Sequence, residues 1–165
     1  MEEQLIKYDH LLEVLERYAI ALRNSYQDNL IRNDRVASGK LLNTVEYEVK
    51  DKNGTYTVSL KLQDYWKWIE SGRPPTTGGG NGDLRRAILD WIRVKPVLPH
   101  PDKDGKLPTP EQLAYLISRK IHMEGYEGTH DLRKATDETW DRFVYEIYEA
   151  IDKDWDSALI KIFKY

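Results

Sequence analysis

Apolar positions at the start of the chain follow a single helical stripe. Steps of three and four residues alternate along it, as they do on one face of an α-helix. Its members are Leu5, Tyr8, Leu12, Leu15, Ala19, Leu22 and Tyr26. We therefore predict a long helix from about Gln4 to Ile31. At 1.5 Å per residue it would be roughly 40 Å long, more than one small core covers, so its stripe faces either the chain's own core or, in part, another chain.

Two runs of alternating apolar and polar residues follow, at 44–50 and 55–62. Asn53 and Gly54 between them are typical of a two-residue hairpin turn, because both positions take a positive φ. Such a turn sets the register, which places Val49 opposite Val58, Tyr47 opposite Leu60 and Val45 opposite Leu62 on one face. Each pair contributes only about 0.2–1 kcal/mol, so we expect a helix to cover this face.

Two shorter helices are predicted in the middle of the chain. Asp83 is placed to cap the first, which ends before Pro96. Thr109 and Gln112 form a capping box at the start of the second, and Gly125 is placed to end it. The residues expected to point inward are Leu84, Ile88, Trp91 and Ile92 in the first helix and Leu113, Leu116, Ile117 and Ile121 in the second.

A last long helix is indicated by the spacing of Leu132, Trp140, Phe143, Ile147 and Ile151. We expect Trp140, like Trp91, to be a core residue. The pattern of 155–165 fits either a continuation of this helix or a returning strand.

The predicted fold class is α+β. A long N-terminal helix and C-terminal helices pack on a small antiparallel sheet built around a β-hairpin. A chain of 165 residues favours a single domain, 1–165, with a flexible loop at 73–82 and a C-terminal extension from about residue 152.

Composition narrows the classes of function. The chain has no cysteine, which removes disulfides and thiolate metal sites, and its net charge of -3 argues against specific nucleic-acid binding. Its apolar runs fall short of the roughly 20 residues of a membrane span, and its acidic start is unlike a secretory signal. We therefore expect no membrane partner, and synthesis and retention in the cytoplasm.

Charge is distributed unevenly along the chain. Residues 137–156 carry eight acids against two basic residues, whereas 84–106 carry six basic residues against three acids. Two interpretations are open. The charges either cover solvated helix faces, or the acidic and basic faces of neighbouring copies meet.

We found no sequence pattern for chemistry. The glycines from Gly78 lack the offsets of a phosphate-binding loop, since Asp83 stands where a third glycine belongs. None of the four histidines has a metal-ligand spacing, although His122 and His130 could converge with Asp131 or Glu124. We predict no catalytic residue, no cofactor and no metal, and keep a small metal-dependent hydrolase or nuclease-accessory domain as an alternative.

Aromatic residues indicate a surface for contact instead. Trp66 and Trp68 are two positions apart and cannot share one helix face, so one is expected inside and the other outside. An outward tryptophan beside Arg73 has the composition of an interface hot spot, or is simply a partly exposed aromatic. The predicted contact residues are Trp66, Trp68, Arg73, Arg85, Arg86 and Arg93.

The order of these features resembles the head-to-tail joining, or tail-completion, proteins of tailed bacteriophages. The matching features are the turn Ser38-Gly39-Lys40-Leu41, the Asn53-Gly54 hairpin, the segment "YWKWIESG" with Glu70 and Gly72, and "LAYLISRKIHMEGYEGTHDL" from Leu113 to Leu132. Together they cover about two thirds of the chain, and the last thirty or so residues match no motif of that family.

This resemblance implies a non-enzymatic virion protein. Its expected partners are copies of itself in a ring and other neck, portal-connector or tail proteins, and its expected location is the neck or tail of the virion after assembly in the bacterial host cytoplasm. A further alternative from a different class is a monomeric adaptor that binds a peptide on the hairpin edge.

Overall fold

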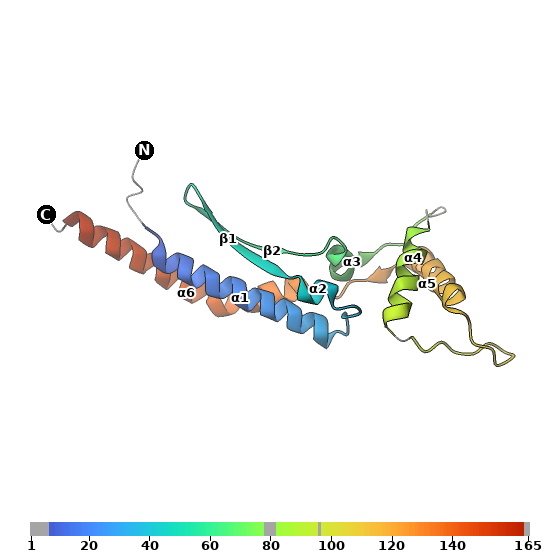
Figure 1. Cartoon of the computed structure of the whole chain (residues 1–165). Helices are drawn as coiled ribbons and strands as arrows, with labels where there is room; N and C mark the ends of the chain where they lie inside the picture. Colours follow the sequence, from blue (N-terminus) through green and yellow to red (C-terminus); the bar gives the residue numbers. More distant parts are fainter. Residues whose placement is uncertain (1–6, 78–81, 96, 164–165) are drawn as a thin grey trace. The chain divides into compact units, whose positions relative to one another are not determined.

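The computed structural model of the chain describes residues 7–77, 82–95 and 97–163 (Figure 1). The regular elements of these residues are helices, two of them long, and two small antiparallel sheets, which confirms the α+β class. The chain divides into two compact units. The described residues of unit 1 lie in 7–32, 44–62 and 131–163, and those of unit 2 lie between 33 and 43 and between 63 and 130.

Unit 1 is built on two long helices, α1 (Asp9–Arg32) and α6 (Asp131–Phe163). They pack along one another and run antiparallel, since Leu11 near the start of α1 meets Asp154 and Asn29 near its end meets Asp131. The buried residues of α1 are Leu11, Val14, Tyr18, Ala19, Leu22, Tyr26, Asn29 and Leu30. Of the predicted stripe, Ala19, Leu22 and Tyr26 are buried, whereas Leu11, Val14 and Tyr18, which were not predicted, take the buried positions nearer the start of α1.

The first helix begins later than predicted. Residue 8 is not helical and α1 starts at Asp9, while Gln4 and Leu5 lie outside the described residues. The difference has a tertiary cause, because a carboxylate from α6 accepts hydrogen bonds from the first turn of α1. Leu12 and Leu15 of the predicted stripe are only half-buried.

The buried face of α6 consists mostly of small or polar residues. They are Asp131, Ala135, Thr139, Ile147, Ala150, Asp154 and Ala158. Short side chains let this helix lie close to the larger side chains of α1. Trp140, predicted in the core, is 47% exposed and meets Tyr18 edge-on at 6.4 Å between ring centroids, because the adjacent Thr139 takes the buried position. The ambiguous segment 155–163 is helical, and residues 164–165 lie outside the described residues.

The hairpin agrees with its prediction. Strands β1 (Glu46–Lys52) and β2 (Thr55–Lys61) pair with Val49 opposite Val58 and Tyr47 opposite Leu60, and Val45 and Leu62 lie just beyond the ladder. Asn53 and Gly54 have φ values of 54° and 79°, as the turn requires. Helix α1 contacts both strands, so unit 1 places α1 between the hairpin and α6.

Unit 2 consists of short elements. They are α2 (Lys40–Asn43), α3 (Trp66–Ser71), β3 (Gly72–Arg73), α4 (Asp83–Val94), α5 (Pro110–Glu124) and β4 (Tyr126–Glu127). Asp83 was predicted to cap α4 but is its first helical residue. Gly82 takes the cap position in a left-handed conformation, and the Asp83 carboxylate instead pairs with Arg86 one turn on.

Helix α5 has the predicted ends but not all of the predicted inward face. Thr109 and Gln112 form both hydrogen bonds of the capping box, and Gly125 ends the helix with φ 68°. The buried residues are the small Ala114 and Ser118, while Leu116 is 52% exposed. On α4, Trp91 and the other apolar residues are at most half-buried.

Candidate subunit-contact surface

Two glycine-containing segments far apart in sequence meet within unit 2. Strand β3 pairs antiparallel with β4, placing Gly72 opposite Glu127 and Arg73 opposite Tyr126. Next to this pair, the Thr129 N–H donates to the Ile69 carbonyl at 2.9 Å, and the His130 N–H donates to the Glu70 carbonyl at 3.1 Å. The end of α3 is therefore fixed to the turn that follows α5.

Glycine is required in this junction because the two backbones touch. A Cβ added to Gly72, which has φ 73°, would collide with the carbonyl oxygen of Tyr126, and one added to Gly128 would collide with that of Glu70. At Gly125, a Cβ would strike the carbonyl of Arg73. At these three glycines, the two segments therefore lie too close together for a residue with a side chain.

The junction presents Trp68 to solvent. Trp68 is 42% exposed, whereas Trp66, two positions earlier in α3, is half-buried. Cations lie over the ring of Trp68: Lys67 Nζ at 5.4 Å and Arg73 Cζ at 5.6 Å from the ring centroid. These distances are within the range of cation–π attraction.

Tyr126 and Arg35 extend this surface. Burial raises the pKa of the Tyr126 phenol, and the positive charges of Arg73 and Arg35 act in the opposite direction, which places both guanidinium groups near that side chain. We name Arg35, Lys67, Trp68, Arg73 and Tyr126 the basic–aromatic cluster. Over the described part of the chain, none of its three cations forms an ion pair with a carboxylate.

The predicted contact arginines of α4 have other surroundings. Arg86 pairs with Asp83 at 2.6 Å and Arg93 with Asp90 at 3.4 Å, both within the helix. Arg85 lies over the ring of Tyr115 on α5, 5.6 Å from its centroid. Of the predicted contact residues, the structure therefore brings together Trp68 and Arg73, and it gives two of the three arginines carboxylate partners of their own.

The first part of the predicted flexible loop is fastened to α5. The Thr76 N–H donates to the His122 carbonyl at 2.8 Å, and Thr76 Oγ1 lies 2.5 Å from His122 Nδ1. Residues 78–81 of this loop lie outside the described residues. Nowhere in 7–77, 82–95 or 97–163 do three His, Asp or Glu side chains gather in a group able to hold a metal ion.

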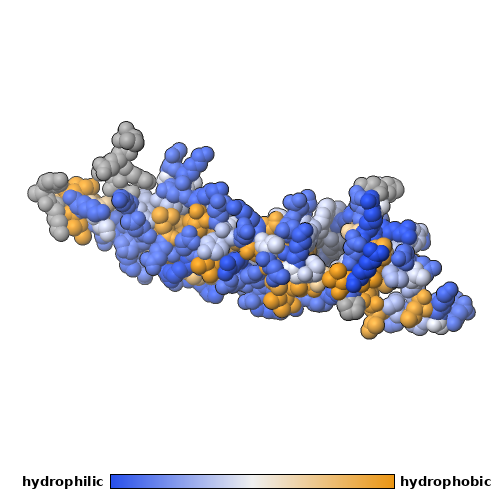
Figure 2. All heavy atoms as spheres, in the orientation of Figure 1, coloured by the Kyte–Doolittle hydropathy of each residue, from blue (hydrophilic) through white to orange (hydrophobic). Residues whose placement is uncertain are grey.

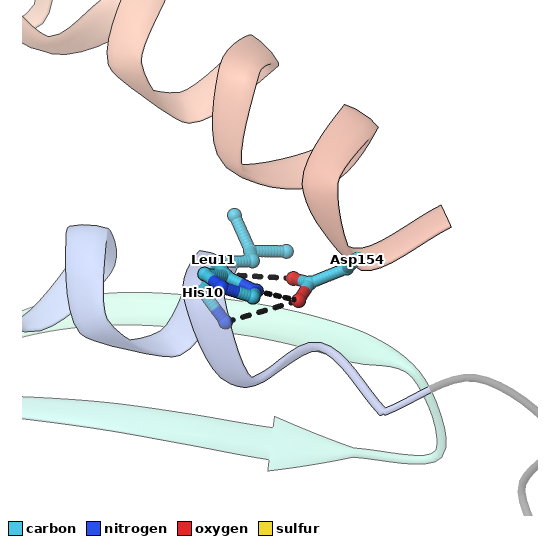
Figure 3. Close-up of polar contacts among 3 residues, drawn as sticks. All are labelled: His10, Leu11 and Asp154. Atoms are coloured by element: carbon cyan, nitrogen blue, oxygen red, sulfur yellow. Dashed lines mark hydrogen bonds and ion pairs between the residues drawn. The ribbon is translucent and has the colours of Figure 1, made fainter. Parts of the chain in front are cut away.

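A second polar feature lies in unit 1, where Asp154 of α6 caps α1 (Figure 3). Its Oδ1 accepts from the His10 N–H at 3.1 Å and lies 2.7 Å from His10 Nδ1, and its Oδ2 accepts from the Leu11 N–H at 2.9 Å. Burial of this carboxyl opposes ionisation, but the hydrogen bonds from Leu11 and His10 outweigh it, so the pKa of Asp154 lies below its ordinary value. This cap anchors the helix pair.

Sequence reasoning missed three members of the cluster, Arg35, Lys67 and Tyr126. Arg35 and Tyr126 are separated from Trp68 by long stretches of chain. A signal was present, however: the glycines at 72, 125 and 128 mark places where backbones approach closely, and a rule that pairs such glycines would have brought Tyr126 next to Arg73.

Comparisons of the chain with family models, curated proteins and solved structures found no match. The resemblance to phage neck proteins thus stays a prediction made from sequence motifs. In the part of the chain that the structure describes, no helix has the length and apolar character needed to cross a membrane.

Proposed function

We propose that this chain is a structural subunit of the neck of a tailed bacteriophage. In this proposal it forms a ring with copies of itself and joins the head connector to the tail or completes the tail. The observation that carries the proposal is the basic–aromatic cluster, which exposes Trp68 and Tyr126 among cations without carboxylate partners in the described residues.

The composition of this cluster suits protein contact. Tryptophan, tyrosine and arginine are the residues most enriched among interface hot spots. The glycine junction next to Trp68 and Arg73 fixes their backbone. The free-energy cost of ordering this backbone when a partner binds would therefore be small. An uncompensated cationic surface also favours a partner that brings carboxylates.

Two motifs of the phage resemblance build this surface together. "ESG" contains the last residues of α3 and its C-cap Gly72, and "GYEGT" forms the turn from Gly125 to Thr129 that pairs with this segment. The two sequence motifs, far apart along the chain, thus form one junction in the structure. This supports the proposal, because both motifs contribute backbone to the junction that carries Trp68 and Arg73.

Self-association is the first test. We expect native mass spectrometry and negative-stain electron microscopy of the purified protein to give closed rings with one copy number, populated increasingly as concentration rises. A monomer at every concentration, in low and in physiological salt, would contradict a self-assembling ring.

The place in the virion needs a genetic test. In a phage that encodes this chain, a stop codon early in its gene is expected to yield separate heads and tails, or tails that fail to attach, and supplying the protein in trans is expected to restore complete particles. Normal infectious particles without the protein would overturn the assignment to the neck.

A further inference from the structure

Helix α6 carries a second stripe, on the side away from α1. Steps of four and three residues connect its members, which are Asp141, Tyr145, Tyr148, Asp152, Trp155 and Leu159, with Phe163 one turn further on. Tyr145 is 77% exposed, Tyr148 62% and Phe163 79%. The helix thus buries its small residues against α1 and leaves its largest side chains uncovered.

The aromatic side chains of this outward stripe expose somewhat more than half of the area that one side of a standard interface buries. An aromatic side chain buries about 150–250 Å² when covered, so the four aromatics of the stripe, each about half-exposed or more, offer on the order of 500 Å². A standard interface uses about 800 Å² per partner, and a monomer rarely leaves a contiguous apolar patch larger than a few hundred Å² uncovered. Figure 2 shows apolar atoms gathered over the C-terminal end of α6, where Ile160 and Ile162 are also exposed.

Carboxylates accompany these aromatics. Glu138, Asp141, Glu149, Asp152 and Asp156 are exposed along the same side of α6, and none of them forms an ion pair within the described residues. By contrast, Glu146 turns toward α1 and pairs with Arg17 at 2.7 Å. The outward stripe is therefore both aromatic and negatively charged.

We propose that the outward stripe of one copy docks on the basic–aromatic cluster of the next copy. The cluster offers the complementary properties: Arg35, Lys67 and Arg73 lack carboxylate partners in the described residues, and Trp68 and Tyr126 are each 42% exposed. This inference rests on the proposed ring and names the two surfaces that would form it.

Charge decides between the two symmetries open to such a contact. A two-fold pairing of α6 with α6 would set its unpaired carboxylates against one another, which is repulsive. Pairing α6 with the cluster joins opposite charges and uses a different surface on each copy. Such a head-to-tail contact repeats from copy to copy and produces a ring when its rotation closes.

Reversing charge on either surface tests this contact. Asp141→Lys with Asp152→Lys, or Lys67→Glu with Arg73→Glu, is expected to weaken wild-type self-association at least tenfold, more strongly in low salt than in high salt. Mixing the two reversed proteins is expected to restore assembly, because each supplies the complement of the other at alternate contacts. The matched control for the Asp141 and Asp152 variant is Glu13→Lys with Asp28→Lys, the same charge change on exposed positions of α1.

Cross-linking distinguishes contact between copies from contact within one. The chain has no cysteine, so one can be introduced on each surface, as Tyr148→Cys in one preparation and Arg73→Cys in another. Treatment of the mixture with a short bis-maleimide is expected to give the covalent heterodimer. A variant that carries both cysteines is treated in the same way at high dilution. If it cross-links within single chains while the mixture gives no heterodimer, the stripe folds onto its own unit 2 and the proposal fails.

The outcomes separate the two proposals. Rings that persist in both charge-reversed variants would leave the neck function standing and show that the interface is wrong. The contact between copies would also be overturned if the stripe bound lipid vesicles or another neck protein while the charge reversals on the stripe left self-association unchanged. Wild-type protein that stays monomeric contradicts the self-assembling ring itself.

Discussion

Different interactions stabilise the inside of each of the two units. Unit 1 buries a continuous apolar stripe of α1 against α6, together with Val45 at the start of the hairpin. In unit 2, Leu41 and Ala114 are the buried apolar side chains among the described residues. Its elements are joined instead by backbone contacts at glycines, by the capping box of α5 and by cations over aromatic rings.

This difference predicts unequal stability of the two units. A buried apolar stripe stabilises unit 1 without help from a partner. A unit with few buried side chains has a small stability of its own and gains most from a partner that covers its exposed apolar residues. We therefore expect unit 2 to open more readily than unit 1 in the isolated protein, and to become protected on assembly.

The largest expected effect comes from the core of unit 1. Leu30 is 1% exposed, so Leu30→Ala should lower the free energy of unfolding by about 2–5 kcal/mol, as is usual when a buried leucine leaves a cavity. Ile31→Ala is the matched control, since Ile31 is 58% exposed and should cost about 0.5 kcal/mol or less. Urea unfolding followed by circular dichroism measures both, and equal losses would show that unit 1 lacks the core described.

Gly128→Ala should act on unit 2 nearly as strongly. Its new Cβ would meet the carbonyl of Glu70, which must move, at a cost of about 3 kcal/mol. Hydrogen exchange is expected to show faster exchange at Thr129 and His130 while the amides of α1 remain protected. Gly54→Ala, in open space with φ 79°, serves as the control and should cost about 1 kcal/mol in unit 1 alone. Uniform loss of protection in both units would contradict their independence.

The cap on α1 should have a smaller effect. Asp154→Ala leaves two N–H groups of α1 without their acceptor and should cost about 2 kcal/mol. Asp154→Asn keeps one acceptor oxygen and should lose about half of that. Thermal unfolding measures the difference. An unchanged Tm for the alanine variant would show that Asp154 does not stabilise unit 1.

The contribution of Asp154 should also depend on pH. Its pKa in the folded protein lies below the ordinary value of 3.8, so the ionised form is the one that folding favours. The gap in stability between the wild type and Asp154→Ala should be complete well above pH 3.8 and should shrink as the pH falls through the lower folded value. A gap that widens on acidification would have the wrong sign for this cap.

The smallest expected effect is on the capping box of α5. Thr109→Ala removes the acceptor for the Gln112 N–H and should cost about 1 kcal/mol, confined to unit 2. Thr109→Ser keeps the hydroxyl and is expected to resemble the wild type. Exchange rates of the first turn of α5 provide the measurement, and equal rates in the two variants would argue against the cap.

Local signals in the sequence predicted local structure well. The Asn53-Gly54 turn fixed the hairpin register, and Thr109 with Gln112 fixed the start of α5, because each depends on neighbouring residues. Trp140 and Leu116 were misplaced for the opposite reason. Both helices bury their small residues, Thr139 in α6 and Ala114 in α5, and periodicity weighted by side-chain size selects the larger neighbours.

The candidate surface was predicted only in part. Trp68 and Arg73 lie within one segment and were found together, whereas Tyr126 reaches them through two-residue strands that carry no strand pattern. Likewise, the start of α1 depends on Asp154, 144 positions away, and no local rule contains that residue.

The cap on α1 also bears on the order of events during synthesis. Helix α1 leaves the ribosome long before Asp154 is made, and the contact of Asn29 with Asp131 already spans 102 positions. Such distant contacts slow folding and delay the completion of a domain during translation. By contrast, the chain between α1 and α6 contains both partners of the glycine junction and both partners of the capping box. We therefore expect the junction and the capping box to form in the nascent chain before α1 is covered. The apolar stripe of α1 should stay accessible to chaperones until α6 has left the ribosome.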